Sequence, residues 1–273
     1  MPIWNRDIDQ YCPNGIKSAI LQNSLLSKEE VDNLFLSSLN GYLFNDSQST
    51  NAILDLGIFH RKRLKFGMLF CPGCFTKEVK YFRKNWRLSS SIACVDCNLK
   101  LCDCCPNCLN PVTFHRLENG YKIVIPEKEM SICSYCFTDL AKTKKIKADE
   151  KIIVYQRFIN DTLRNGFNDI TQYSFTYFEV LHTLERMLYT KSIKWNKVKI
   201  SVEKKHNVVF KEEGFKRLAE REKSLLACYE ILENWPYSFI NFINENNFTF
   251  TDFVRDKKDK LPSWFTNIIK LTI

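Results

Sequence analysis

The chain has 273 residues, of which 45% are hydrophobic and 14% aromatic, a composition that excludes intrinsic disorder and predicts two or three small folded domains. No stretch approaches the roughly 20 consecutive apolar residues of a membrane span, and the first residues lack a signal-peptide pattern. We therefore expect a cytoplasmic protein that contacts no membrane.

The formal net charge is +9, and nearly all of the excess falls in residues 141–206, with fourteen basic and seven acidic side chains. A local excess of this kind favours contact with phosphate groups.

Residues 1–65 are predicted to form a helical N-terminal segment. Ser27 and Glu30 have the spacing of a capping box, in which a hydroxyl and a carboxylate each accept a backbone N–H at the start of a helix. The apolar residues that follow share one helical face: Val31, Leu34, Phe35 and Leu39. A second short helix is predicted over residues 52–56.

Residues 66–140 are dominated by cysteine, with eight of the twelve cysteines arranged as four Cys-x-x-Cys pairs. A thiolate pair at this spacing is half of a tetrahedral metal site, and two pairs make a closed four-sulfur site. Nineteen residues separate the first two pairs and twenty-four separate the last two. We therefore predict two tandem zinc ribbons with small β-strands, each with four cysteine ligands, which together bind two Zn²⁺. The predicted ligands are Cys71, Cys74, Cys94 and Cys97 for one ion, and Cys105, Cys108, Cys133 and Cys136 for the other.

The cysteine pattern leaves alternatives open. Cys102 and Cys105 are also separated by two residues, but the Cys-Pro-Asn-Cys sequence at 105–108 matches the Cys-Pro-Gly-Cys sequence at 71–74. We prefer that register, which leaves Cys102 and Cys104 as free or weakly associated thiols. Iron, alone or in an iron–sulfur cluster, suits the same ligands. Disulfides are disfavoured in a reducing cytosol.

Residues 141–273 are predicted to form a helical C-terminal domain with a basic face. Two helices are expected from two apolar faces, with Ile152, Tyr155, Ile159 and Leu163 on one and Tyr177, Leu181, Leu184 and Leu188 on the other. Gly166 should end the first helix, and Thr176 with Glu179 should cap the second. A long helix is predicted over residues 212–234, with Cys228 as a small buried residue, and Pro262 should open a last helix.

The basic side chains of this domain are the candidate nucleic-acid contacts. The helix pair fits a helix-turn-helix or an ordinary helical hairpin, because that motif has no sharp sequence code. The candidate residues lie before and after the pair: Lys142, Lys144, Lys145, Lys147, Lys191, Lys194, Lys197 and Lys199.

No catalytic site is recognisable in the sequence. The four histidines form no metal-binding or acid–base pattern, and there is no phosphate-cradling glycine loop. A zinc ion closed in by four thiolates has no open position for a substrate. We therefore predict that the protein is not an enzyme.

A distinctive segment joins the cysteine pairs. Phe70-Cys-Pro-Gly-Cys74 is followed by Tyr81-Phe-Arg-Lys-Asn-Trp-Arg-Leu88, by the pair at 94–97 and by Cys-Pro-Asn-Cys at 105–108. This order of motifs resembles the TniQ family, the target-selection proteins of bacterial transposons, including the CRISPR-associated ones. Trp235-Pro236 and Pro262-Ser-Trp264 are more loosely similar to the helical end of that family.

The resemblance implies a non-catalytic adaptor that marks the DNA target for transposition and recruits the AAA+ ATPase of the transposon. Target DNA and a CRISPR effector complex are the further partners that it implies. In the joining segment Arg83, Trp86 and Arg87 are candidate partner contacts, with Trp86 as a packed strut between the cysteine pairs as the alternative. Two other functions stay open, a zinc-dependent helix-turn-helix transcription regulator and a redox or iron–sulfur protein. The oligomeric state is not predicted.

Overall fold

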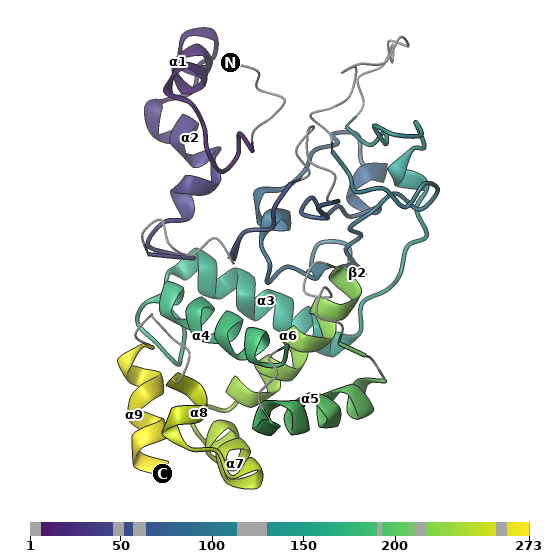
Figure 1. Cartoon of the computed structure of the whole chain (residues 1–273). Coiled ribbons are helices and arrows are strands. Elements are labelled where there is room, and N and C mark those ends of the chain that lie inside the picture. The colour runs from purple at the N-terminus through teal and green to yellow at the C-terminus, as the bar shows by residue number, and fades with distance from the viewer. Residues whose placement is uncertain are drawn as a thin grey trace. The chain divides into compact units, whose positions relative to one another are not determined.

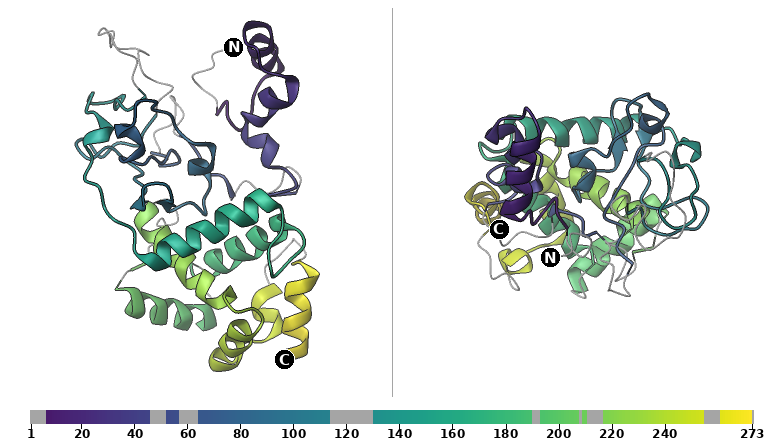
Figure 2. Two further views of the ribbon diagram at one scale, coloured as in Figure 1. Left: turned by 180° about the vertical axis from the view of Figure 1, so that it is seen from behind. Right: turned by 90° about the horizontal axis from the view of Figure 1, so that it is seen from above.

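The computed structural model describes residues 7–45, 52–56, 64–113, 130–189, 193–207, 209–210, 217–254 and 261–272. Within these residues the fold is mostly helical, as predicted, with nine α-helices and one small two-stranded sheet (Figure 1, Figure 2). None of the described helices is both long and apolar enough to cross a membrane.

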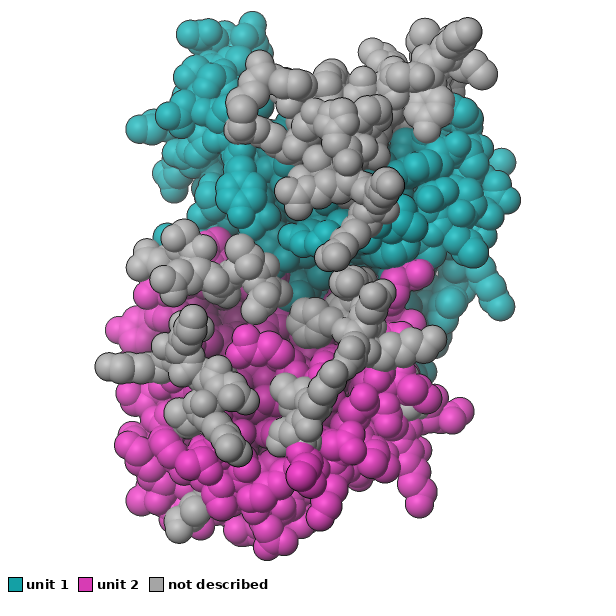
Figure 3. All heavy atoms as spheres, in the orientation of Figure 1, with its two compact units in different colours: residues 1–40, 53–156 teal, residues 41–52, 157–273 magenta. Residues whose placement is uncertain are grey.

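The chain divides into two compact units, residues 1–40 with 53–156 and residues 41–52 with 157–273 (Figure 3). The predicted N-terminal segment and cysteine region fall mostly in the first unit, and the predicted C-terminal domain falls mostly in the second. Helix α3 (Glu150–Asn165) begins in the first unit and ends in the second.

Two helices, α1 (Asn14–Asn23) and α2 (Lys28–Asn33), form the N-terminal part of the first unit. The predicted capping box is confirmed: the Ser27 hydroxyl accepts the backbone N–H of Glu30 at 3.2 Å, and the Glu30 carboxylate accepts that of Ser27 at 2.8 Å. The predicted apolar face is only partly covered. Val31 and Phe35 are buried, Leu39 is half-buried and Leu34 is exposed.

The short helix predicted over residues 52–56 is wrong. Ile53 forms an antiparallel bridge with Leu88, and the backbone N–H of Leu54 donates to the carbonyl of Arg87 at 2.8 Å. Because a five-residue helix has few hydrogen bonds of its own, pairing with a distant segment satisfies this backbone better.

The cysteine region of the first unit has little regular structure. Its elements include the 3₁₀ turns η4 (Cys74–Thr76), η5 (Lys84–Arg87) and η7 (Leu140–Lys142), and the antiparallel strands β1 (Ala93–Cys94) and β2 (Leu99–Lys100). The core is aromatic: Phe75 stacks on Phe70 with 5.6 Å between ring centroids and meets Trp86 edge-on at 6.3 Å. Two-residue strands contribute few hydrogen bonds, so this region depends on side-chain cross-links for its stability.

Arg87 is the central polar cross-link of the first unit. The residue is only 1% exposed, and its guanidinium donates to the Asp9 carboxylate at 2.8 Å and to the Leu54 carbonyl at 2.9 Å. It also forms a paired contact with the Asp7 carboxylate. One arginine therefore holds together three segments that are distant in sequence.

The second unit consists of packed helices. After the end of α3 come α4 (Ser174–Met187), α5 (Ile193–His206), α6 (Leu218–Leu232), α7 (Tyr237–Asn246), α8 (Phe250–Val254) and α9 (Ser263–Thr272). Helix α6 packs against α4, α5 and α7, and α7 packs against α9. Aromatic rings fill the space between the last helices, with Phe239 4.8 Å from Phe265 and 5.7 Å from Phe253.

Helical periodicity predicts most of this unit, and the helix starts are less well predicted. Helix α3 ends at Asn165, where Gly166 has φ +80°, and the predicted face of α4 is buried. The capping box at Thr176 is wrong, because α4 begins at Ser174 and the Thr176 hydroxyl donates to the Tyr173 carbonyl at 2.7 Å. Helix α6 lies within the predicted range 212–234, of which residues 212–216 are outside the described residues.

Candidate metal centres

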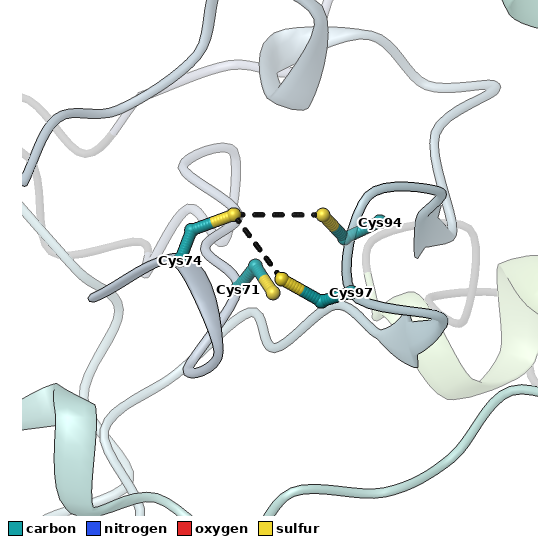
Figure 4. Close-up of side chains that lie close together, drawn as sticks. All are labelled: Cys71, Cys74, Cys94 and Cys97. Atoms are coloured by element: carbon teal, nitrogen blue, oxygen red, sulfur yellow. Dashed lines mark hydrogen bonds between the residues drawn. The ribbon is translucent and has the colours of Figure 1, made fainter. Parts of the chain in front are cut away.

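The first four predicted ligands converge in the first unit (Figure 4). Cys71 and Cys74 flank the turn that leads into η4, Cys94 is in β1, and Cys97 is in the loop between β1 and β2. The Cys74 sulfur lies 3.6 Å from the sulfurs of both Cys94 and Cys97. All four sulfurs lie within 4.8 Å of one another, so the predicted grouping of these residues is confirmed.

The sulfur spacing fits a tetrahedral ion. Zn–S bonds of about 2.3 Å in a tetrahedron place neighbouring sulfurs about 3.8 Å apart. A disulfide would bring two sulfurs to about 2.05 Å, and none of the twelve cysteines, all of them described, is part of a disulfide. The group could therefore hold one metal ion.

The protonation of the first group also indicates a ligand set. Hydrogen bonding from Cys71 lowers the pKa of Cys94 to about 5, and burial raises the pKa of Cys74 to about 12. The hydrogen bond to Cys94 raises the pKa of Cys71 as well. Cys94 is thus the thiol of the group that ionises most readily, and a cation beside the sulfurs would favour ionisation of Cys71 and Cys74 as well.

The second group of predicted ligands also converges, and its two halves repeat each other. The sulfurs of Cys105 and Cys136 are 3.5 Å apart, those of Cys108 and Cys133 are 3.8 Å apart, and all four lie within 4.8 Å. The first cysteine of each pair, Cys105 or Cys133, accepts a backbone N–H from the fourth residue after it at 3.0 and 2.9 Å, respectively. It also donates its own N–H to the fifth residue after it, at 2.9 Å in both halves.

Each half of the second group contains a left-handed residue. Leu109 and Phe137, which follow the second cysteine of their pairs, have φ +57° and φ +60°. Bulky residues rarely adopt this conformation, which costs about 1–2 kcal/mol per residue. The side chain of Leu109 is 65% exposed, so its burial does not offset that cost. The repeated turn geometry that faces the sulfurs is therefore maintained against the local backbone preference.

Cys102, Cys104 and Cys228 belong to neither group, and the preferred register of the cysteine pairs is confirmed. The backbone of Cys102 exchanges two 2.9 Å hydrogen bonds with that of Phe70. The main chain of Cys102 therefore connects the segment that precedes the pair at 71–74 with the segment that precedes the pair at 105–108. Cys228 is fully buried in α6, as predicted, and its burial raises the pKa of the thiol well above the ordinary value.

Gly73 leaves space for a sulfur of the first group. Its φ of −69° suits any residue, but a Cβ atom there would lie 2.8 Å from the Leu99 Cδ1 atom and 3.0 Å from the Cys97 sulfur. We expect Gly73→Ala to destabilise the metal-loaded protein by about 1–3 kcal/mol through overpacking, measured by thermal unfolding. Asn107→Ala is the matched control, because the equivalent position of the second group already carries a side chain. Equal effects of the two substitutions would contradict this explanation.

Arg83 provides positive charge beside the first group. Its guanidinium forms an ion pair with Asp96, donates to the Cys74 sulfur at 3.8 Å, and lies over the Trp86 ring at 5.7 Å. Outer contacts of this kind typically change metal affinity 10–100-fold, so we expect Arg83→Gln to weaken the first centre by about that factor. Competition with a chromogenic chelator measures the loss, with Lys77→Gln as an exposed control. Unchanged affinity would assign Arg83 a role in folding alone.

The other two candidate partner contacts lie in the interior. Trp86 is buried in the aromatic core, and Arg87 is buried among Asp7, Asp9 and Leu54. Their side chains make contacts within the first unit. Trp86 therefore fits the alternative interpretation, a strut beside the cysteine groups.

The candidate lysines differ in their surroundings. Lys142, Lys144, Lys145 and Lys147 are exposed, on a segment that pairs with β2 through a 2.9 Å bond from the Lys100 N–H to the Ile146 carbonyl. On α5, Lys194 forms an ion pair with Asp252 at 2.6 Å, Lys199 lies 4.0 Å from Glu203, and Lys197 is exposed. Lys191 is outside the described residues. Lys204, which was not named among the candidates, lies two turns after Lys197 and is also exposed.

Fold and sites together define a mostly helical protein with two four-cysteine groups, each of which could hold a metal ion. Comparisons of the chain with protein-family models, with curated proteins and with solved structures find no match.

Proposed function

We propose that the two cysteine groups each bind a structural Zn²⁺ and that the protein is a non-catalytic cytoplasmic adaptor for transposition. In this proposal the protein marks the DNA target and recruits the AAA+ ATPase of a transposon, with a CRISPR effector complex as a further partner. The zinc ions would fold the cysteine region, whose strands are two residues long. The exposed lysines would contact DNA phosphates.

The observation that carries the proposal is the closure of both cysteine groups. Four sulfurs around each position leave no open coordination site, which supports a structural role for the metal. The order of the cysteine pairs and the arginine–tryptophan segment between them support the resemblance to TniQ proteins. The burial of Trp86 and Arg87 gives that segment a structural role, as expected of a scaffold that presents surfaces to partners.

Two measurements test the proposal. Elemental analysis should find two zinc ions per chain in a colourless protein, whereas a visible absorption band with bound iron would favour the redox alternative. Affinity purification of the tagged chain from its native cells, with ATP and DNA present, should retain an AAA+ ATPase. Failure to retain any such ATPase, with both zinc ions bound, would overturn the adaptor role.

A further inference from the structure

Helix α5 presents one face of mixed chemistry to solvent. Ile193 is 81% exposed and Ile200 is 55% exposed, and four polar residues lie beside them at helical spacing: Asn196, Lys197, Ser201 and Lys204. The opposite face is buried through Trp195 and Val198. Figure 1 and the left view of Figure 2 show α5 at the edge of the second unit.

The buried face holds α5 firmly. The Trp195 ring lies 4.8 Å from the Phe248 ring, and its Nε1–H donates to the Asp252 carbonyl at 3.2 Å. Lys194 contacts the Asp252 carboxylate at 2.6 Å and the Asn247 carbonyl at 3.0 Å. The exposed face is therefore presented by a helix whose orientation within the unit is set by packing, which recognition of a fixed ligand requires.

The charge of α5 is positive, and it is distributed unevenly around the helix. Five lysines and one glutamate give residues 193–206 a net charge of +4. Three lysines have carboxylate neighbours, namely Lys194 with Asp252, Lys199 with Glu203, and Lys205 with Glu230. Lys197 and Lys204, on the exposed face, have no ion-pair partner among the residues that the structure describes. The exposed face thus has positive charge that is available to an anionic ligand.

We propose that this face of α5 enters the major groove of double-stranded DNA and reads base edges directly. Its side chains match what the groove offers: asparagine pairs with adenine, lysine with guanine or a phosphate, serine with several bases, and isoleucine with the thymine methyl group. A surface for phosphate contact alone would need only the lysines, so the exposed isoleucines and Asn196 favour sequence readout. The inference rests on the proposed role at DNA, and adds the element that recognises the target.

The test uses the full-length, zinc-loaded chain and a library of random DNA duplexes, from which bound molecules are sequenced. The expected result is enrichment of a short motif. Asn196→Ala should remove the preference at one motif position, with about a 5- to 150-fold loss of discrimination there. The double variant Lys197→Ala with Lys204→Ala should weaken binding to all sequences and lower the slope of log affinity against log salt by about two.

A matched control and the contrary outcomes make the test decisive. Lys205→Ala, on the same helix but paired with Glu230, should leave the motif unchanged. No enriched motif, or a motif unaffected by Asn196→Ala, would overturn the inference. If the α5 variants lose a protein partner and keep DNA binding, the face docks a protein and the inference is again wrong.

The same data separate this inference from the proposed function. Retention of the ATPase without any motif removes the role of α5 and leaves the adaptor. A motif read by α5 without retention of an ATPase keeps the inference and replaces the adaptor with a DNA-binding regulator of transcription.

Discussion

Replacement of Cys94 with serine is expected to remove one metal equivalent from the purified protein and to unfold the cysteine region of the first unit. Cys94 lies in β1, and its sulfur is 3.6 Å from that of Cys74. Metal binding contributes about 10–16 kcal/mol to the folding of zinc-finger peptides at neutral pH. The free energy lost with one ion is therefore larger than the stabilisation that this small core can provide. Elemental analysis gives the metal content, and limited proteolysis with mass spectrometry shows whether residues 66–113 become accessible.

Cys102→Ser is the matched control for this prediction. Cys102 lies in the same region and belongs to neither sulfur group, so its substitution should leave the metal content unchanged. Loss of metal from Cys102→Ser, or full metal content in Cys94→Ser, would contradict the assigned ligands.

Replacement of Arg87 with alanine is expected to produce the largest loss of stability among single substitutions outside the metal centres. It would leave the carboxylate of Asp7, which is buried, without its partner, and would remove donors from Asp9 and Leu54. Breaking a buried pair from one side costs about 3–5 kcal/mol. In a unit of this size we expect the midpoint of thermal unfolding to fall by roughly 10 °C. Circular dichroism measures this midpoint.

Arg164→Ala controls for the loss of an arginine as such. Arg164 pairs with Asp161 at 3.0 Å, and its side chain is 74% exposed, so the pair is worth about 0–1 kcal/mol. Similar shifts for the two variants would show that Arg87 does not act through its buried contacts.

The sequence predicts the cysteine groups well because their geometry is local. A two-residue spacing brings two sulfurs together in one turn, and only the pairing of turns must come from the fold. Proline in the third pair decides the register that the structure confirms, with Cys105 in the second group and Cys102 outside it. Helix α4 is predicted for a similar reason, because its apolar residues repeat within the helix.

The features that the sequence does not predict depend on distant contacts. The helix expected over residues 52–56 is replaced by pairing with Leu88, and Arg87 is buried because Asp7 and Asp9, about eighty residues earlier, meet it there. An arginine beside a tryptophan looks the same in sequence whether it faces a partner or the core. The ion pairing of the α5 lysines also depends on a distant residue, because Asp252 contacts Lys194 and not Lys197.

The turns at Leu109 and Phe137 also bear on how firmly each ion would be held. In the first group the corresponding left-handed position is Asn98, a residue type that tolerates this geometry, whereas the second group bends a leucine and a phenylalanine. The backbone cost of these two turns lowers the stability of the second sulfur arrangement, which would weaken its hold on an ion relative to the first group. When metal becomes scarce in the cell, the half of the region around residues 105–136 would empty first, while the half around residues 71–97 stays loaded.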